Sequence, residues 1–156
     1  MMNDMYNMHP YGQTDWMSMK FKDFNQFIKN LELAITDERS AIVFYTELYK
    51  IAPTEMAKYA VKTALEDEII HDKKLTKLYK YLTGSKPNIK LETVTFNHFY
   101  EGLQKAFIDE VKAFDFYKEM YLSVFCPTIR DLLYSIQHDE IEHATLFNWV
   151  HTEIIK

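Results

Sequence analysis

Six residues whose side chains can bind metal ions recur at a fixed spacing in this sequence. They are Glu38, Glu68 and His71 in the first half and, 72 positions later, Glu110, Glu140 and His143 in the second. In each half a single Glu is followed 30 residues later by a Glu-x-x-His pair. Carboxylate oxygens and imidazole nitrogens without thiolates suit iron or manganese better than copper or a structural zinc. One such pair would be a weak signal, but its repetition predicts a single site for two metal ions.

The charges of these six side chains favour two divalent ions. Four buried carboxylates without compensation would cost many kcal/mol or would have to stay protonated. Two divalent ions supply four positive charges, and two neutral imidazoles add none. The alternative is a buried salt-bridge network without metal. In such a network the hydrogen-bonding needs of six polar groups close together in the core would be hard to satisfy. The single Glu of each half would either bridge the two ions or complete their coordination shells.

Four further residues are expected to support this site. Asp67 and Asp139 directly precede the Glu of each Glu-x-x-His pair, where a carboxylate can accept the second ring N–H of a ligand His. Tyr45 and Tyr117 lie seven residues, about 10 Å along a helix, beyond the Glu of their own half. Because helical side chains lean toward the N-terminus, we expect Tyr45 to hydrogen-bond Glu110 and Tyr117 to hydrogen-bond Glu38. We assign the two tyrosines as candidate catalytic residues; the alternative is that they are ordinary core tyrosines.

Four segments position these residues, and each has the three-and-four spacing of an inward helix face. The segments are residues 31–49, 57–82, 99–121 and 129–154, and the inward face is predicted to include Tyr49 and Phe107. Pro53 and Pro127 indicate tight turns within each half, and Gly84 indicates the end of the second helix. Asp23 and Thr95 are predicted N-caps of the first and third helices.

One long connection, residues 85–94, separates the two halves. About ten extended residues reach roughly 33 Å, which is enough to return the chain along a helix of similar length. The third helix would then run parallel to the second. The predicted fold is all-α: a four-helix bundle with one crossover between the second and third helices and an internal two-fold repeat. Because the paired Glu residues of each half are equidistant from its turn, all six ligand candidates should lie at one level.

Composition limits the other functions that the chain can have. The net charge is -5 with two arginines, which argues against a nucleic-acid partner. One cysteine excludes an internal disulfide, and no apolar run reaches the roughly 20 residues that span a bilayer. We therefore expect a cytoplasmic protein without a membrane partner. Residues 1–22 form an expected Met-rich, flexible arm, for which binding of a soft metal is the alternative, and residues 23–156 form the expected bundle domain.

The repeated Asp-Glu-x-x-His motifs, Asp67 to His71 and Asp139 to His143, resemble those of the ferritin-like di-iron carboxylate superfamily. Within it, the internal symmetry is most similar to the rubrerythrin-like, or erythrin, branch. The resemblance covers about residues 23–155. It implies a non-haem di-iron centre, with manganese as the alternative metal, that reacts with hydrogen peroxide or dioxygen as a peroxide reductase or ferroxidase.

Two features depart from that family. No rubredoxin domain with its cysteines follows the bundle, so we expect an external electron donor, either rubredoxin-like or another reductase. Many relatives carry an additional ligand Glu where this chain has Ala113, which leaves the set of four Glu and two His. The same set also resembles bacterioferritin, but Ile69 stands where that family has its haem-binding Met.

Three other functions remain as alternatives: an iron-storing protein of the ferritin or bacterioferritin kind, a manganese catalase-like enzyme, and a scaffold with a vestigial site. A homodimer, either simple or with exchanged helices, is the expected assembly.

Overall fold

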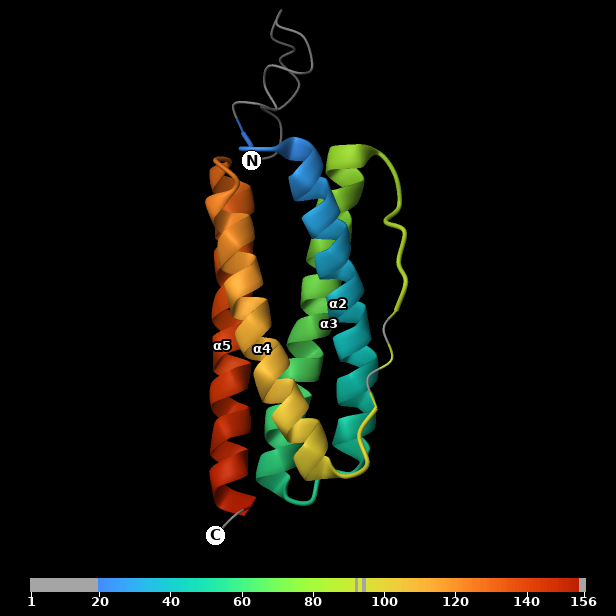
Figure 1. Cartoon of the computed structure of the whole chain (residues 1–156), viewed down its shortest axis with the longest axis vertical. Coiled ribbons are helices and arrows are strands. Elements are labelled where there is room, and N and C mark those ends of the chain that lie inside the picture. Colours follow the sequence, from blue (N-terminus) through green and yellow to red (C-terminus); the bar gives the residue numbers. More distant parts are fainter. Residues whose placement is uncertain (1–19, 92, 94, 155–156) are drawn as a thin grey trace, which may run out of the picture.

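The computed structural model describes residues 20–91, 93 and 95–154, and its four helices lie side by side as one elongated bundle (Figure 1). The helices are α2 (Phe24–Lys50), α3 (Glu55–Thr83), α4 (Phe99–Leu122) and α5 (Pro127–Ile154). The described residues contain no β-strand, only one isolated bridge between Phe21 and Val124. The predicted all-α fold is confirmed.

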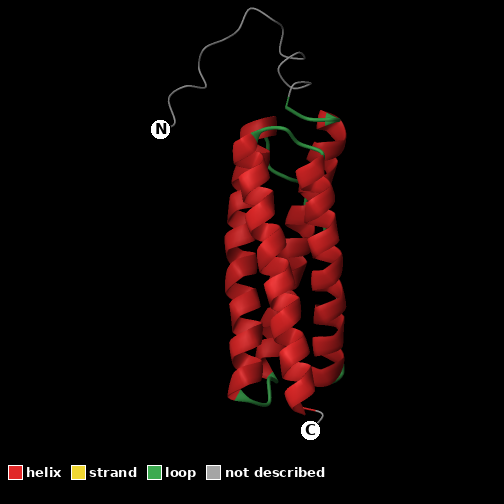
Figure 2. Ribbon diagram, turned by 90° about the vertical axis from the view of Figure 1, so that its left-hand side faces the viewer, coloured by secondary structure: helices red, strands yellow, loops and turns green. Residues whose placement is uncertain are grey.

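The chain forms two antiparallel hairpins joined by one crossover. α2 packs on α3, and α4 packs on α5, each pair across a short turn. The connection after α3 then runs the length of the bundle back to the start of α4, so that α3 and α4 are parallel (Figure 1). The turned view also shows the helices side by side, with the visible connections at the two ends of the bundle (Figure 2). The predicted crossover topology is therefore correct.

Side-chain and backbone caps fix where the helices begin and end. The Asp23 side chain accepts a hydrogen bond from the Gln26 amide at the start of α2, as predicted. Gly84 ends α3 in the left-handed conformation, with φ of 71°, which glycine adopts without steric cost. The predicted cap at Thr95 is wrong. α4 begins one turn later, because the ring of His98 accepts the hydrogen bond from the Glu101 amide.

The buried side chains form two apolar clusters with a polar layer between them. One cluster, at the α4–α5 turn end, is built around Phe27, Leu31 and Leu133. The other cluster contains Leu48 and Phe147. All six predicted ligands are buried, and they come from the stretches of helix between the clusters. The prediction that they meet at one level in the middle of the bundle is confirmed.

The inward face of the helices differs from the prediction at three positions, one of which is Ile154 at the end of α5, predicted to face inward but 37% exposed. Tyr49 and Phe107 are each 38% exposed, whereas Leu48 and Ala106 are buried in their place. The inward stripe of a globular helix is wider than a single row of residues, so the spacing alone did not decide between neighbours.

The segment before α2 is attached to the far turn of the bundle. Lys22 donates its amide hydrogen to Ser123, and Phe125 donates to Lys20. Phe21 is 2% exposed and packs in the first apolar cluster. The predicted arm of residues 1–22 thus has its last three residues packed on the bundle, and its residues 1–19 lie outside the described part of the chain.

None of the helices in the described ranges is both long enough and apolar enough to cross a membrane.

Candidate metal centre

Each of the four helices contributes carboxylate or imidazole groups to one buried cluster. α2 and α4 carry the single glutamates, whereas α3 and α5 carry the Glu-x-x-His pairs, in which positions i and i+3 share one helix face. The six side chains are at most 4% exposed, and they are Glu38, Glu68, His71, Glu110, Glu140 and His143. The structure therefore brings together all the residues that the sequence singled out, while their roles as ligands stay a prediction.

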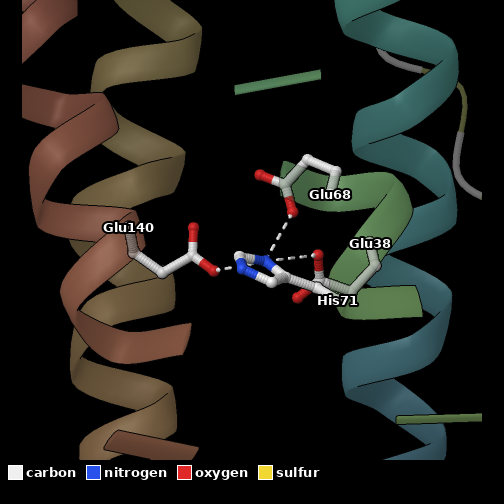
Figure 3. A group of neighbouring side chains, drawn as sticks. All are labelled: Glu38, Glu68, His71 and Glu140. Carbon is white, nitrogen blue, oxygen red and sulfur yellow. Dashed lines mark hydrogen bonds and ion pairs between the residues drawn. The ribbon is translucent and has the colours of Figure 1, made fainter. Parts of the chain in front are cut away.

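His71 lies at the centre of the first group of carboxylates (Figure 3). Its Nδ1 atom is 3.3 Å from Glu68 Oε2, 3.4 Å from Glu38 Oε2 and 3.5 Å from Glu140 Oε1. These carboxylates come from α2, α3 and α5, so a single imidazole nitrogen meets oxygens from three other side chains. One oxygen from each Glu and one His nitrogen can therefore converge on one cation.

The second half builds the matching group around His143. Its Nδ1 atom is 3.4 Å from Glu110 Oε1, 3.7 Å from Glu68 Oε1 and 3.7 Å from Glu140 Oε2. In each of the two groups the candidate ligand atoms lie within 4.8 Å of one another. The two groups are thus four-ligand sets related by the internal repeat.

Glu68 and Glu140 belong to both groups, whereas Glu38 and Glu110 each belong to one. The sequence left open whether the single glutamates bridge the ions or complete their shells. This geometry favours completion by Glu38 and Glu110. The shared glutamates, which precede the two histidines in the motif, are the ones placed to bridge.

Unpaired buried atoms show that the cluster suits cations. Glu38 Oε2, Glu140 Oε1 and His143 Nδ1 are buried without a hydrogen-bond partner. A buried polar atom that lacks a partner costs about 1–3 kcal/mol, so three at one place need a common explanation. The two carboxylate oxygens have lone pairs, and the imidazole nitrogen has one when it is not protonated. All three belong to the two ligand groups, so two metal ions would supply the missing partners.

The outer nitrogen of each histidine meets an aspartate from the opposite half of the chain. His71 Nε2 lies 3.0 Å from Asp139 Oδ2, and His143 Nε2 lies 3.1 Å from Asp67 Oδ2. A carboxylate acceptor at this position holds the proton on Nε2 and leaves Nδ1 with its lone pair toward the centre. Asp67 and Asp139 therefore stand where the sequence predicted supporting carboxylates.

The two tyrosines also reach across the bundle. Tyr45 of α2 donates its hydroxyl hydrogen to Glu110 Oε1, and Tyr117 of α4 donates to Glu38 Oε1. Both predicted hydrogen bonds are present. Each tyrosine thus orients the single glutamate of the other half, and each is at most 3% exposed.

Burial and mutual repulsion shift the acid–base equilibria of the metal-free cluster. Burial raises the pKa of Glu110 to about 8, with a further rise from its hydrogen bond to Glu140. Burial lowers the pKa of His143, but the nearby carboxylates of Glu110 and Glu140 outweigh it and raise the value to about 11. Burial also lowers the pKa of His71, but Asp139 and the carboxylates of Glu140, Glu38 and Glu68 outweigh it and raise the value. Without metal the site therefore retains protons, which cations would displace.

The tyrosine hydroxyls remain protonated at neutral pH. Burial raises the pKa of Tyr45 and of Tyr117 well above the usual value, and the nearby carboxylates raise it further. Both groups are consequently hydrogen-bond donors rather than phenolates, which fits their contacts with Glu110 and Glu38.

An open cavity reaches the cluster from one side. It has a volume of ≈ 380 Å³ and lies between α2 and α4, whose contacts with each other are fewer than those within either hairpin. Glu68 and Glu140 lie among its lining residues, and Ala113 lines its wall. The sequence indicated that a ligand found in related proteins is absent at Ala113, but it did not predict a cavity. The spacing of residues along each helix does not determine the distance between two helices.

A supporting ion pair was also missed from the sequence. Arg39 Nε lies 2.7 Å from Asp72 Oδ1, and the same guanidinium donates to Thr76 Oγ1 at 3.1 Å. Arg39 and Asp72 directly follow Glu38 and His71, so this contact ties α2 to α3 beside the first group of ligands. Val111 and Ala144 occupy the corresponding places in the second half, so no repeated pattern marked the pair.

Comparisons with known proteins agree with this arrangement. Residues 29–100 match the sequence model of the rubrerythrin family. The uncharacterized protein YhjR of Bacillus subtilis is 28% identical over 142 residues, which cover 91% of this chain and 94% of that protein.

Solved structures share the fold at lower sequence identity. A hypothetical protein from Pyrococcus furiosus superposes with a TM-score of 0.74 at 19% identity, covering 86% of this chain and 94% of the other. A ferritin-like, diiron-carboxylate protein from Bacillus anthracis gives a TM-score of 0.68 at 20% identity, covering 81% and 96%. These structures confirm the fold, and together with the match to the rubrerythrin sequence model they confirm the resemblance to ferritin-like di-iron proteins that the motifs indicated.

Proposed function

We propose that this chain, a ferritin-like four-helix bundle similar to rubrerythrins, is a non-haem di-iron oxidoreductase that reacts with hydrogen peroxide or dioxygen. The observation that carries the proposal is the pair of buried ligand groups that share Glu68 and Glu140. Carboxylates that belong to both groups would hold two ions close enough together to serve one oxidant. An external reductase would return the electrons.

The ligand chemistry supports iron, with manganese as the alternative. Oxygen and imidazole ligands without thiolate suit both metals, and a carboxylate can change its binding mode when the charge of the metal changes. In the proposed centre Glu38 and His71 would hold one ion, Glu110 and His143 would hold the other, and Glu68 and Glu140 would contribute to both. When bound, the iron pair would supply the two electrons that reduce a peroxide.

The remaining residues have orienting and proton-holding roles in this proposal. Tyr45 and Tyr117 keep the single glutamates in place through their hydroxyl groups and hold a proton beside them. Asp67 and Asp139 hold the imidazole rings at their outer nitrogens. The oxidant would enter through the cavity between α2 and α4, because this open cavity is lined by four of the clustered glutamates, Glu38, Glu68, Glu110 and Glu140.

Rapid mixing of anaerobic diferrous protein with each oxidant tests the proposal. Iron content is measured first, and two ions per chain are expected. The absorbance of the oxidised centre should then form much faster with hydrogen peroxide than with dioxygen. Equal or slower reaction with peroxide would contradict a peroxide reductase. Protein loaded with manganese that evolves oxygen from peroxide would instead support a catalase.

Iron storage is the second candidate, because one structural neighbour is itself described as ferritin-like. Storage requires a shell of many subunits around a mineral, whereas a peroxide reductase does not. Size-exclusion chromatography with light scattering separates the two. We expect a homodimer, and a large closed shell would favour storage.

A further inference from the structure

The cavity between α2 and α4 is larger than the proposed oxidants require. Its volume is ≈ 380 Å³, and one water molecule in the liquid occupies about 30 Å³. The space therefore corresponds to about twelve waters, and it falls within the roughly 300–1,000 Å³ that ligand pockets have. Hydrogen peroxide and dioxygen have two heavy atoms each, so the metal ions and such an oxidant would leave much of the cavity empty.

Small side chains on both walls create this space. Four alanines line it, and they form two pairs that are 72 positions apart: Ala34 with Ala106, and Ala41 with Ala113. Phe44 and Phe116, another such pair, provide aromatic surface. Bundle interiors are otherwise packed to crystal-like density, and a void loses dispersion contacts on its lining. An apolar guest of matching size would restore those contacts.

The buried and the exposed lining residues of the cavity differ in chemistry. Its lining includes Glu38 and Glu140, each of which has a buried oxygen without a partner. Its exposed lining residues include Asp37, Asp109 and Lys112, and the lysine pairs with Asp109 at 3.1 Å. Two acids against one base disfavour an anionic guest. The lining thus suits a neutral molecule with a polar reactive end and a compact apolar group.

We propose that the cavity binds compact, neutral organic hydroperoxides, with the peroxide group toward the carboxylate cluster and the organic group against the alanines and phenylalanines. The inference rests on the proposed function and specifies its substrate class. The O–O bond of ROOH breaks, with two electrons coming from two Fe(II), one from each, and two protons from solvent. The products are the alcohol ROH, one water and two Fe(III), so atoms and electrons balance.

Binding of the alcohol product tests the cavity independently of turnover. 2-Phenyl-2-propanol, the alcohol formed from cumene hydroperoxide, is titrated into the metal-loaded protein and followed by calorimetry. Saturable one-to-one binding is expected for the natural chain. Ala113→Leu should weaken it by about tenfold or more, because three added carbons occupy the guest's volume. Val111→Leu on the same helix is the control, since Val111 does not line the cavity.

Rapid mixing then tests the substrate class. The diferrous protein is oxidised with cumene hydroperoxide and, separately, with hydrogen peroxide, and the ratio of the two second-order rate constants is measured. Ala113→Leu should lower this ratio by about tenfold, whereas Val111→Leu should not change it. Ala41→Leu, at the repeat-related wall position, provides a second variant if Ala113→Leu does not fold.

The outcomes separate the inference from the proposed function. Oxidation by hydrogen peroxide alone, or an unchanged ratio in both Leu variants, overturns the substrate class and leaves the peroxide reaction standing. Oxidation by neither peroxide overturns the peroxide reaction itself, and oxidation by neither peroxide nor dioxygen overturns the proposed function. Absence of saturable alcohol binding also counts against the cavity as an organic site, whatever the metal does.

Discussion

At the scale of single residues, the aspartates behind the histidines connect the two halves of the site. Asp139 supports His71, and Asp67 supports His143, so each imidazole is oriented by the hairpin that does not carry it. Loss of the outer acceptor allows the ring to turn and the proton to move to Nδ1, which then cannot bind a cation.

Replacement of either aspartate by asparagine should therefore weaken metal binding. We expect Asp67→Asn and Asp139→Asn each to lower the affinity for Mn(II) or Fe(II) by about 10–100-fold. Equilibrium dialysis with metal analysis measures the change. Asp131→Asn, at an exposed position on α5, is the control. An affinity that stays the same in both variants would show that the histidines do not depend on these contacts.

The acid–base properties of the cluster predict how stability depends on pH. Glu110, with its pKa raised to about 8 by burial and its bond to Glu140, holds its proton more tightly when folded. That contribution is complete below the ordinary carboxylate pKa and is lost as pH rises through about 8. His143, raised to about 11, acts in the same direction at higher pH, whereas Glu140, with a lowered pKa, opposes them.

The Tm of metal-free protein should consequently fall as pH is raised from 5 to 8. Metal binding requires deprotonated ligands, so the increase in Tm on adding Mn(II) should be larger at pH 8 than at pH 5. Differential scanning calorimetry at both pH values measures the two effects. A metal-free Tm that rises over this range would contradict the raised pKa values.

Sequence spacing predicted which residues gather at the centre, but not which of them are shared. The 72-residue repeat and the positions of the turns determine the height of each side chain along its helix. Sharing depends on how far Glu68 and Glu140 extend toward the bundle axis, which depends on the distance between helices. The hydrogen bonds of Tyr45 and Tyr117 were predictable because the direction of a helical side chain is known in advance.

At the scale of helices, the repeat predicted the order and direction of all four elements and failed at some ends and faces. Asp23 caps α2, but the repeat-related Thr95 does not cap α4, since His98 competes successfully for that role. Caps depend on local side-chain contacts, and these differ between the two halves although the ligand positions are the same in both. The prediction also placed Phe107 on the inward face, whereas Ala106 is the buried residue. The larger apolar side chain was chosen over its alanine neighbour because both fit the helical spacing.

The end of α3 offers a test at this scale. Gly84 has φ of 71°, and apart from its two chain neighbours no residue lies within 4 Å of the place where a side chain would begin. Gly84→Ala should thus act through the backbone alone and lower the free energy of unfolding by about 1–2 kcal/mol. Gly84→Asn should cost less, because asparagine adopts this conformation more readily. Urea denaturation measures both, and equal losses would contradict a purely conformational origin.

At the scale of the whole molecule, the bundle is nearly symmetric about the metal centre. Two hairpins related by the repeat supply equal ligand groups, and the two shared glutamates lie on opposite hairpins. Replacing a shared glutamate should therefore affect the binding of both ions, whereas replacing one of the other two should affect the binding of one ion.

Metal stoichiometry tests this difference. Glu38→Gln or Glu110→Gln should weaken the retention of one ion and leave about one per chain after desalting, since each belongs to a single group. Glu68→Gln should weaken both, since it belongs to the two groups. Glu66→Gln, exposed on the same helix, should retain two. Loss of only one ion from Glu68→Gln would show that it does not bridge.

The sharing of Glu68 and Glu140 also bears on how such a chain can arise. Neither hairpin carries a complete set of ligands for even one ion, yet two copies of a single hairpin, associated about a two-fold axis, would carry the set for both. A gene encoding one hairpin could thus have specified a working dimer before it was duplicated and joined through the connection between Gly84 and His98. Fusion then allows the two copies to diverge independently. The ion pair of Arg39 is one such difference, since Val111 stands at the corresponding place in the second half. Two identical chains could not have differed in this way.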